Sequence, residues 1–106
     1  MSALRAWLAD REPRAPDALR ERLDALVSAH PEWEALPLPE ALLAAGEQLL
    51  QQVLVAPGRL RSTAVDLLAA DAAVTYAFEA AADEPGRLVE LAEGAVKRIA
   101  AVAKPV

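Results

Sequence analysis

Residues 58–83, which read GRLRSTAVDLLAADAAVTYAFEAAAD, form the segment that decides the fold of this chain. The segment predicts a helix over residues 59–83, and apolar side chains occupy nearly every face of that helix. Such a helix cannot lie on the surface of a small protein, because more than one of its sides must be covered. We therefore expect a central, Ala-rich helix around which the other helices pack.

Two apolar faces appear when this helix is turned by about 100° per residue. The larger side chains lie on one line, formed by Leu60, Leu67, Val74 and Phe78. The opposite face is small and smooth, and it consists of Val65, Ala69, Ala72, Ala73, Tyr76 and Ala80. We expect the small face to pack closely against another helix, either of the same chain or of a second copy.

One acid, Asp71, lies within the line of larger side chains, about 40° from Leu67. Burial of an isolated carboxylate is costly, so we expect Asp71 to be hydrogen-bonded, paired or protonated. Thr75 lies one turn later and can offer its hydroxyl. Asp71 and Thr75 are thus candidate buried polar residues that fix the helix register. The alternatives are an edge position that touches water and a ligand-binding or acid–base role for Asp71.

Four further helices are predicted, over residues 2–9, 16–30, 39–55 and 86–103, with prolines in the breaks between them. The connector HPEWEALPLP holds three prolines, and we expect Trp33 and Leu36 in it to fold back onto the other helices. Gly46, in the middle of a helix, predicts a close helix crossing. No alternation of period two persists, so we expect an all-α bundle of about five helices, without a β-sheet, as a single domain over residues 1–106.

The composition favours a protein that assembles. Hydrophobic residues make up 55% of the 106 residues, above the roughly 45–50% of an average domain. Because a small chain with so many apolar residues leaves some of them exposed, we expect a homodimer or a complex with another helical protein. The net charge of −5, without a basic stripe, argues against nucleic-acid binding.

The remaining composition predicts a cytoplasmic protein. No apolar run approaches the roughly 18 residues that span a membrane, and the start MSALRAWLADREP lacks the apolar core of a signal peptide. The chain has no cysteine, which fits a reducing compartment. Nine arginines against two lysines, with abundant alanine, are typical of a high-GC bacterial genome.

The chain offers few residues for catalysis. His30 is the only histidine. It lies at the C-terminal end of a helix, where the helix dipole stabilises it, so its presence requires no catalytic role. The Glu-x-x-His pairs of carboxylate-bridged metal sites are absent. We therefore expect no enzyme activity, no metal and no cofactor.

The turn PGRLRST at residues 57–63 is the best candidate ligand site. A glycine turn, two arginines and a helix N-terminus are suited to an anion, so the candidate contacts are Arg59, Arg61, Ser62 and Thr63. The alternative is an ordinary capped helix start with two solvated arginines.

The segment Gly58-Arg59-Leu60-Arg61-Ser62 resembles the diphosphate-binding turn of trans-isoprenyl diphosphate synthases, and residues 71–79 resemble an Ala-rich helix of that family. The resemblance covers about a quarter of the chain and implies a diphosphate contact at Arg59 and Arg61. The aspartate-rich DDxxD motifs that bind magnesium in that family are absent. The sequence thus favours a non-catalytic interaction module, with a small-molecule or anion-binding bundle as the alternative.

Overall fold

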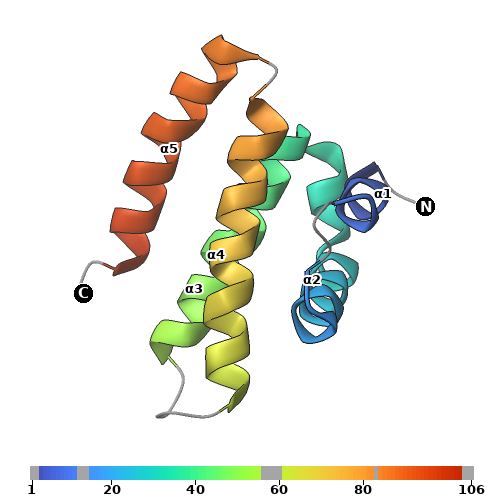
Figure 1. The fold of residues 1–106 in the computed structure, drawn as a ribbon. Coiled ribbons are helices and arrows are strands. Elements are labelled where there is room, and N and C mark those ends of the chain that lie inside the picture. The colour runs from blue at the N-terminus through green and yellow to red at the C-terminus, as the bar shows by residue number, and fades with distance from the viewer. Residues whose placement is uncertain (1–2, 12–14, 56–60, 83, 104–106) are drawn as a thin grey trace.

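The computed structural model describes residues 3–11, 15–55, 61–82 and 84–103 (Figure 1). This part of the chain contains five α-helices, one 3₁₀ helix and no strand, which confirms the predicted all-α fold. The elements are α1 (Ala3–Ala9), α2 (Asp17–Ala29), the 3₁₀ helix η1 (Pro31–Ala35), α3 (Leu38–Val55), α4 (Arg61–Ala81) and α5 (Pro85–Ala103). The described helix ends lie within two residues of the predicted ones.

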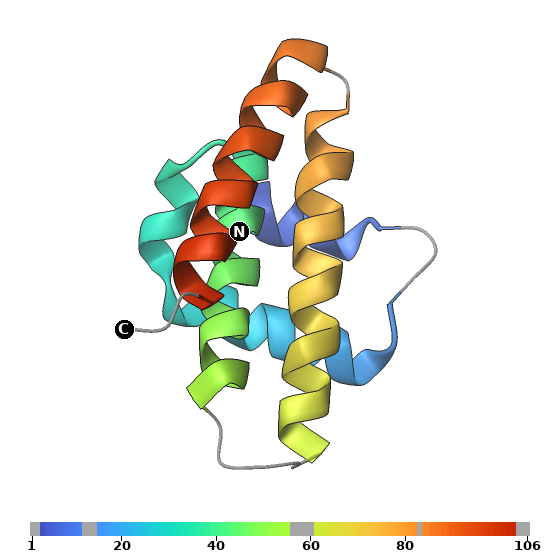
Figure 2. The same ribbon diagram turned by 90° about the vertical axis from the view of Figure 1, so that its left-hand side faces the viewer.

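The helices form three layers. The antiparallel pair α3 and α4 lies in the middle, with α1 and α2 on one side and α5 on the other (Figure 1). α3 and α4 share the most extensive contact between any two described elements. A quarter turn of the molecule shows α5 lying over α3 while it diverges from α4 toward its C-terminal end (Figure 2). The predicted central helix is therefore half of a central pair.

The close contact of α3 with α4 follows from small side chains on both helices. Ala69, Ala73 and Ala77 on α4 are fully buried. Gly46 is buried on α3, and a Cβ placed on it would lie 2.8 Å from Val74 Cγ2 and 3.4 Å from the carbonyl oxygen of Ala70. Only glycine lets the two backbones approach this closely, so the predicted close crossing at Gly46 is confirmed.

The connector between α2 and α3 is more regular than predicted, because Pro31–Ala35 forms a 3₁₀ helix. Trp33 is buried, as expected, and the imidazole ring of His30 stacks on it with 4.2 Å between the ring centroids. The prediction for Leu36 is wrong, since 42% of this residue is exposed. Leu36 follows the last turn of η1 in an extended conformation, which carries its side chain away from the core.

α5 is the least covered of the long helices. Pro85 begins it, which suits a first helical position. Leu91 and Ala95 are its only buried residues among those described, although its apolar stripe also includes Leu88 and Ile99. The apolar surface of α5 is thus wider than the surface that α3 and α4 cover.

Candidate binding groove

The two faces of α4 differ in burial in the folded chain. The small face lies inside: Ala69 and Ala73 are fully buried, and Val65, Ala72, Tyr76 and Ala80 are half-buried. Tyr76 meets Trp7 of α1 edge to face, with 5.7 Å between the ring centroids. The small face is therefore a packing surface within one chain, covered by α3 and by the helices of the α1–α2 layer.

The prediction that Asp71 and Thr75 are buried is wrong, because both are exposed. The physical reason is that α3 and the α1–α2 layer cover the side of α4 that holds Ala69, Ala73 and Ala77, which leaves the side of Asp71 and Thr75 toward solvent. Asp71 lies about 160° around the helix from the fully buried Ala73. Asp71 thus occupies the edge position in water that the sequence left open as an alternative.

The line of larger side chains borders an open groove of about 480 Å³. Its walls and floor come from α3, α4 and α5, and its lining residues are Gly46, Leu50, Leu67, Leu68, Ala70, Asp71, Val74 and Ile99. The groove lies where α5 diverges from α4 (Figure 2). Among the described residues, Asp71 is the only ionisable one in this lining, so this part of the groove offers an apolar surface with one carboxylate.

Exposed apolar side chains gather on the three helices that form this groove. Among the described residues, the large apolar side chains with high exposure are Leu36, Leu54, Val55, Leu67, Leu68, Val89 and Val96. All of them except Leu36 lie on α3, α4 or α5. Leu67 and Leu68 line the groove itself, and more than half of each is exposed.

Arg22 joins α2 to the central pair. Its Nε donates to Asp66 Oδ1 of α4 at 2.5 Å, and its Nη2 donates to Gln52 Oε1 of α3. Both side chains of the ion pair are largely covered, with 28% of Arg22 and 17% of Asp66 exposed. Arg22 also borders an open hollow between α2 and α4. Its guanidinium is committed to these two partners, so Arg22 serves as a link between helices.

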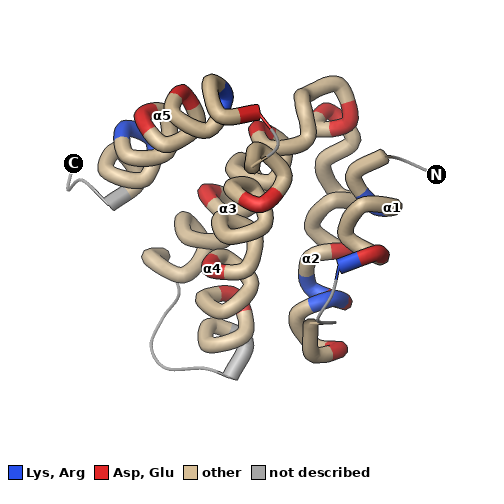
Figure 3. Tube along the Cα trace, turned by 45° about the horizontal axis from the view of Figure 1, so that its top comes forward, with Lys and Arg blue, Asp and Glu red and all other residues tan. Residues whose placement is uncertain are grey.

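Two arginines attach α5 to α3. Arg98 donates from Nε and Nη2 to Glu47 Oε2, at 2.8 and 2.5 Å. Arg87 lies 3.2 Å from Glu84 and 3.7 Å from Glu40. Figure 3 shows acidic and basic segments interspersed over the helices, whereas α4 between Thr63 and Ala82 carries acids and no base. The ionic groups of α5 therefore hold its α3 side, and its α4 side is left apolar.

The predicted anion turn falls largely outside the described residues. Arg59 is not among them, and only the helical backbone of Arg61 and Ser62 is described. Thr63 is half-buried in the first turn of α4. The anion contact at these four residues stays a prediction.

The polar groups do not form a catalytic or metal constellation in the described ranges. No cluster of three or more His, Cys, Asp or Glu residues in these ranges is placed to hold a metal ion. His30 Nδ1 lies 3.0 Å from Glu32 Oε2 on the surface, with the imidazole held flat on Trp33. The hydrogen bond to His30 lowers the pKa of the Glu32 carboxyl below its usual value of 4.5. This arrangement packs η1 against the end of α2.

Comparison of the chain with protein-family models, with curated proteins and with solved structures finds no match. The comparisons thus add nothing to the resemblance of Gly58–Ser62 to a diphosphate-binding turn. In the part of the chain that the structure describes, no helix combines the length and apolar character required to span a bilayer.

The groove is the feature that sequence reasoning missed. Leu50 and Ile99 lie on the apolar sides of their helices, but no local pattern in the sequence shows that these sides meet around an opening. The available signal was a surplus of apolar residues on residues 39–55, 59–83 and 86–103. Each of these helices has more apolar faces than its neighbours in a single chain can cover.

Proposed function

We propose that this chain is a non-catalytic interaction module whose groove between α4 and α5 binds a helical polypeptide. The observation that carries this proposal is the groove itself, with Leu67 and Leu68 more than half exposed beside it. Isolated exposed apolar residues are ordinary, whereas a contiguous apolar patch marks a binding surface. An amphipathic helix is the natural occupant of an apolar groove between two helices.

The polar groups support the same proposal. Arg22 of α2 and the two arginines of α5 are engaged in contacts between helices, as Arg22 with Asp66 and Arg98 with Glu47 illustrate. Among the described residues that line the groove, no second carboxylate and no histidine accompanies Asp71. A surface with one hydrated acid and apolar walls is suited to recognition of shape and apolar area.

A small-molecule site is the second candidate, and the size of the groove favours it. Its volume of about 480 Å³ lies in the roughly 300–1,000 Å³ range of ligand pockets. Such pockets bury most of their ligand, however, whereas this groove is open to solvent. An open apolar channel between helices is better matched to a helix than to a compact molecule.

A photo-crosslinking amino acid in place of Leu67 tests the proposed function in cells that make the full chain. We expect a discrete polypeptide adduct at position 67, which disappears when Leu68→Glu is added. The matched control places the same group at Val55, which is 81% exposed at the end of α3 and absent from the groove lining. Equal crosslinking at 67 and 55, or no polypeptide adduct at 67, contradicts the proposal.

A further inference from the structure

The exposed face of α4 forms a ridge on the surface of the molecule, and it also forms one wall of the groove. Leu67 and Leu68 protrude into solvent from the N-terminal half of α4, and the same two residues line the groove beside it. A two-fold interface requires one patch that fits itself, because each residue contacts the equivalent patch on the other subunit. A ridge adjoining a groove of the same apolar chemistry meets that requirement.

We propose that a second copy of this chain occupies the groove. The α4 helix of each copy lies in the opening between α4 and α5 of the other, and the two α4–α5 pairs together form a four-helix bundle. Bundles of this kind are packed by apolar residues from facing helices, here Leu67, Val74 and Ile99. This inference rests on the proposed function, since it names the polypeptide that the groove binds.

The exposed area of the chain is consistent with an interface to one second copy. The chain exposes 6682 Å², whereas a compact monomer of its 11.2 kDa mass is expected to expose about 5,700 Å². The excess is about 1,000 Å², and a stable interface covers about 800 Å² on each partner. The excess area is therefore large enough to supply one interface of standard size.

The effect of charge on binding distinguishes a second copy of the chain from a basic helix as the occupant of the groove. Each copy carries a net charge of −5, and Asp71 is the only ionisable residue among the described residues that line the groove. Two like-charged copies repel, and salt screens that repulsion. Dimerisation must therefore strengthen as salt is raised, and Asp71→Asn must strengthen it as well. Binding of a basic helix to Asp71 would instead weaken as salt is raised, and it would also weaken in Asp71→Asn.

Sedimentation equilibrium of the purified full chain, over a range of protein and salt concentrations, tests the proposal. We expect a mass twice the 11.2 kDa of one chain, with a dissociation constant that falls as salt rises. Leu67→Glu is expected to weaken dimerisation by about 30-fold or more, the size of a hot-spot substitution. The control Val55→Glu, outside the groove lining, must leave the dimer intact.

Circular dichroism of each variant shows whether it is folded. If Leu67→Glu loses its helical signal, Leu68→Glu replaces it, because Leu68 also lines the groove and 55% of it is exposed, so that a charge there is tolerated in the monomer. A wild-type chain that stays monomeric at every concentration overturns the second-copy proposal, as does a dimer that Val55→Glu disrupts equally. A monomer that still gives a discrete adduct at position 67 refutes only this inference, whereas a monomer without that adduct refutes the proposed function too.

Discussion

Gly46 of α3 lies against Val74 of α4 with no room for a further carbon atom, since a Cβ on Gly46 would lie 2.8 Å from Val74 Cγ2. This contact sets the distance between the two central helices. It also forms part of the groove lining, to which both residues belong. The absence of a side chain at Gly46 thus lets α3 lie close against the Ala70–Val74 side of α4.

Substitution of Gly46 by alanine is expected to destabilise the fold despite the better helix propensity of alanine. Alanine gains about 1 kcal/mol over glycine inside a helix, but overpacking costs about 1–3 kcal/mol. Val74 is β-branched and stiff in a helix, so it cannot turn aside easily. Urea unfolding at one fixed protein concentration should show a free energy of unfolding lower by about 1 kcal/mol.

Two controls isolate the contact. Gly94 lies inside α5 with nothing within 4 Å of an added Cβ, so Gly94→Ala should stabilise the fold by about 1 kcal/mol. In a Val74→Ala background, Gly46→Ala should also become stabilising, because the obstructing methyl group is gone. The same sign and size of the Gly46→Ala effect in both backgrounds would rule out the steric explanation.

The existence of α4 could be predicted from its sequence, but its buried face could not. Apolar residues surround the helix, so periodicity alone did not distinguish the Leu67 side from the Ala73 side. The buried side depends on contacts with other helices, such as that of Gly46 in α3 with Ala70 and Val74. Asp71 was placed in the core for this reason, although it is exposed.

Loss of the Asp66 carboxylate should destabilise the attachment of α2. Arg22 and Asp66 are 44 positions apart in the sequence and 2.5 Å apart in the fold. Asp66→Ala leaves a largely covered guanidinium with Gln52 alone, which should lower the free energy of unfolding by about 1–3 kcal/mol. The control Asp17→Asn disrupts a pair in which Asp17 is 85% exposed, and it should cost less than about 1 kcal/mol. Equal losses in urea unfolding would contradict a special role for Arg22.

The ion pairs between helices are a second feature that could not be predicted from the sequence. The charges of Arg22, Glu47 and Arg98 lie on polar faces, where periodicity predicts only exposure to water. Their pairing depends on how α2 and α5 lie across the central pair, and no local pattern encodes that arrangement. The groove was missed for the same reason, since Leu50 and Ile99 are 49 positions apart.

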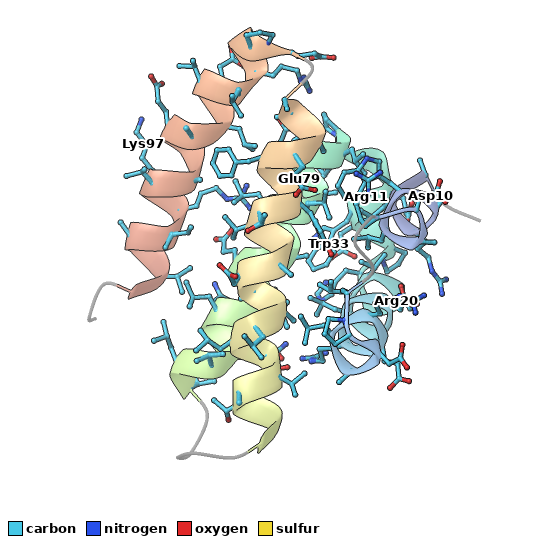
Figure 4. All side chains as sticks on the ribbon, viewed as in Figure 1. Asp10, Arg11, Arg20, Trp33, Glu79 and Lys97 are labelled. Atoms are coloured by element: carbon cyan, nitrogen blue, oxygen red, sulfur yellow. The ribbon has the colours of Figure 1, made fainter. Side chains whose placement is uncertain are left out.

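α5 should open more readily than α3 and α4. Leu91 and Ala95 are its only buried residues among those described, and its link to α3 includes the Arg98–Glu47 pair. Arg98→Met should speed hydrogen exchange of the α5 amides by about fivefold, which corresponds to about 1 kcal/mol. Lys97→Met is the matched control, because Lys97 extends away from α4 into solvent (Figure 4). Faster exchange in both variants, or in neither, would show that the ion pair does not hold α5.

The pair His30 and Glu32 should give a pH dependence of defined sign. The hydrogen bond from His30 holds the pKa of Glu32 below 4.5 in the folded chain. The stabilisation is therefore present above the unfolded pKa and is lost as the pH falls through the lower, folded pKa. An NMR titration of the Glu32 carboxyl carbon should show a midpoint that rises toward 4.5 in His30→Ala. An identical midpoint in both proteins would exclude His30 as the cause.

The most direct test of a covered groove is the reactivity of one introduced cysteine. The chain contains no cysteine, so Leu67→Cys and Val55→Cys each provide a single thiol. In cells that make the protein, we predict that a maleimide reagent modifies the thiol at 55 rapidly and the thiol at 67 slowly. Denaturation should make the two rates equal. Equal, rapid modification of both thiols in the native protein would mean that the groove is bare and would contradict the account.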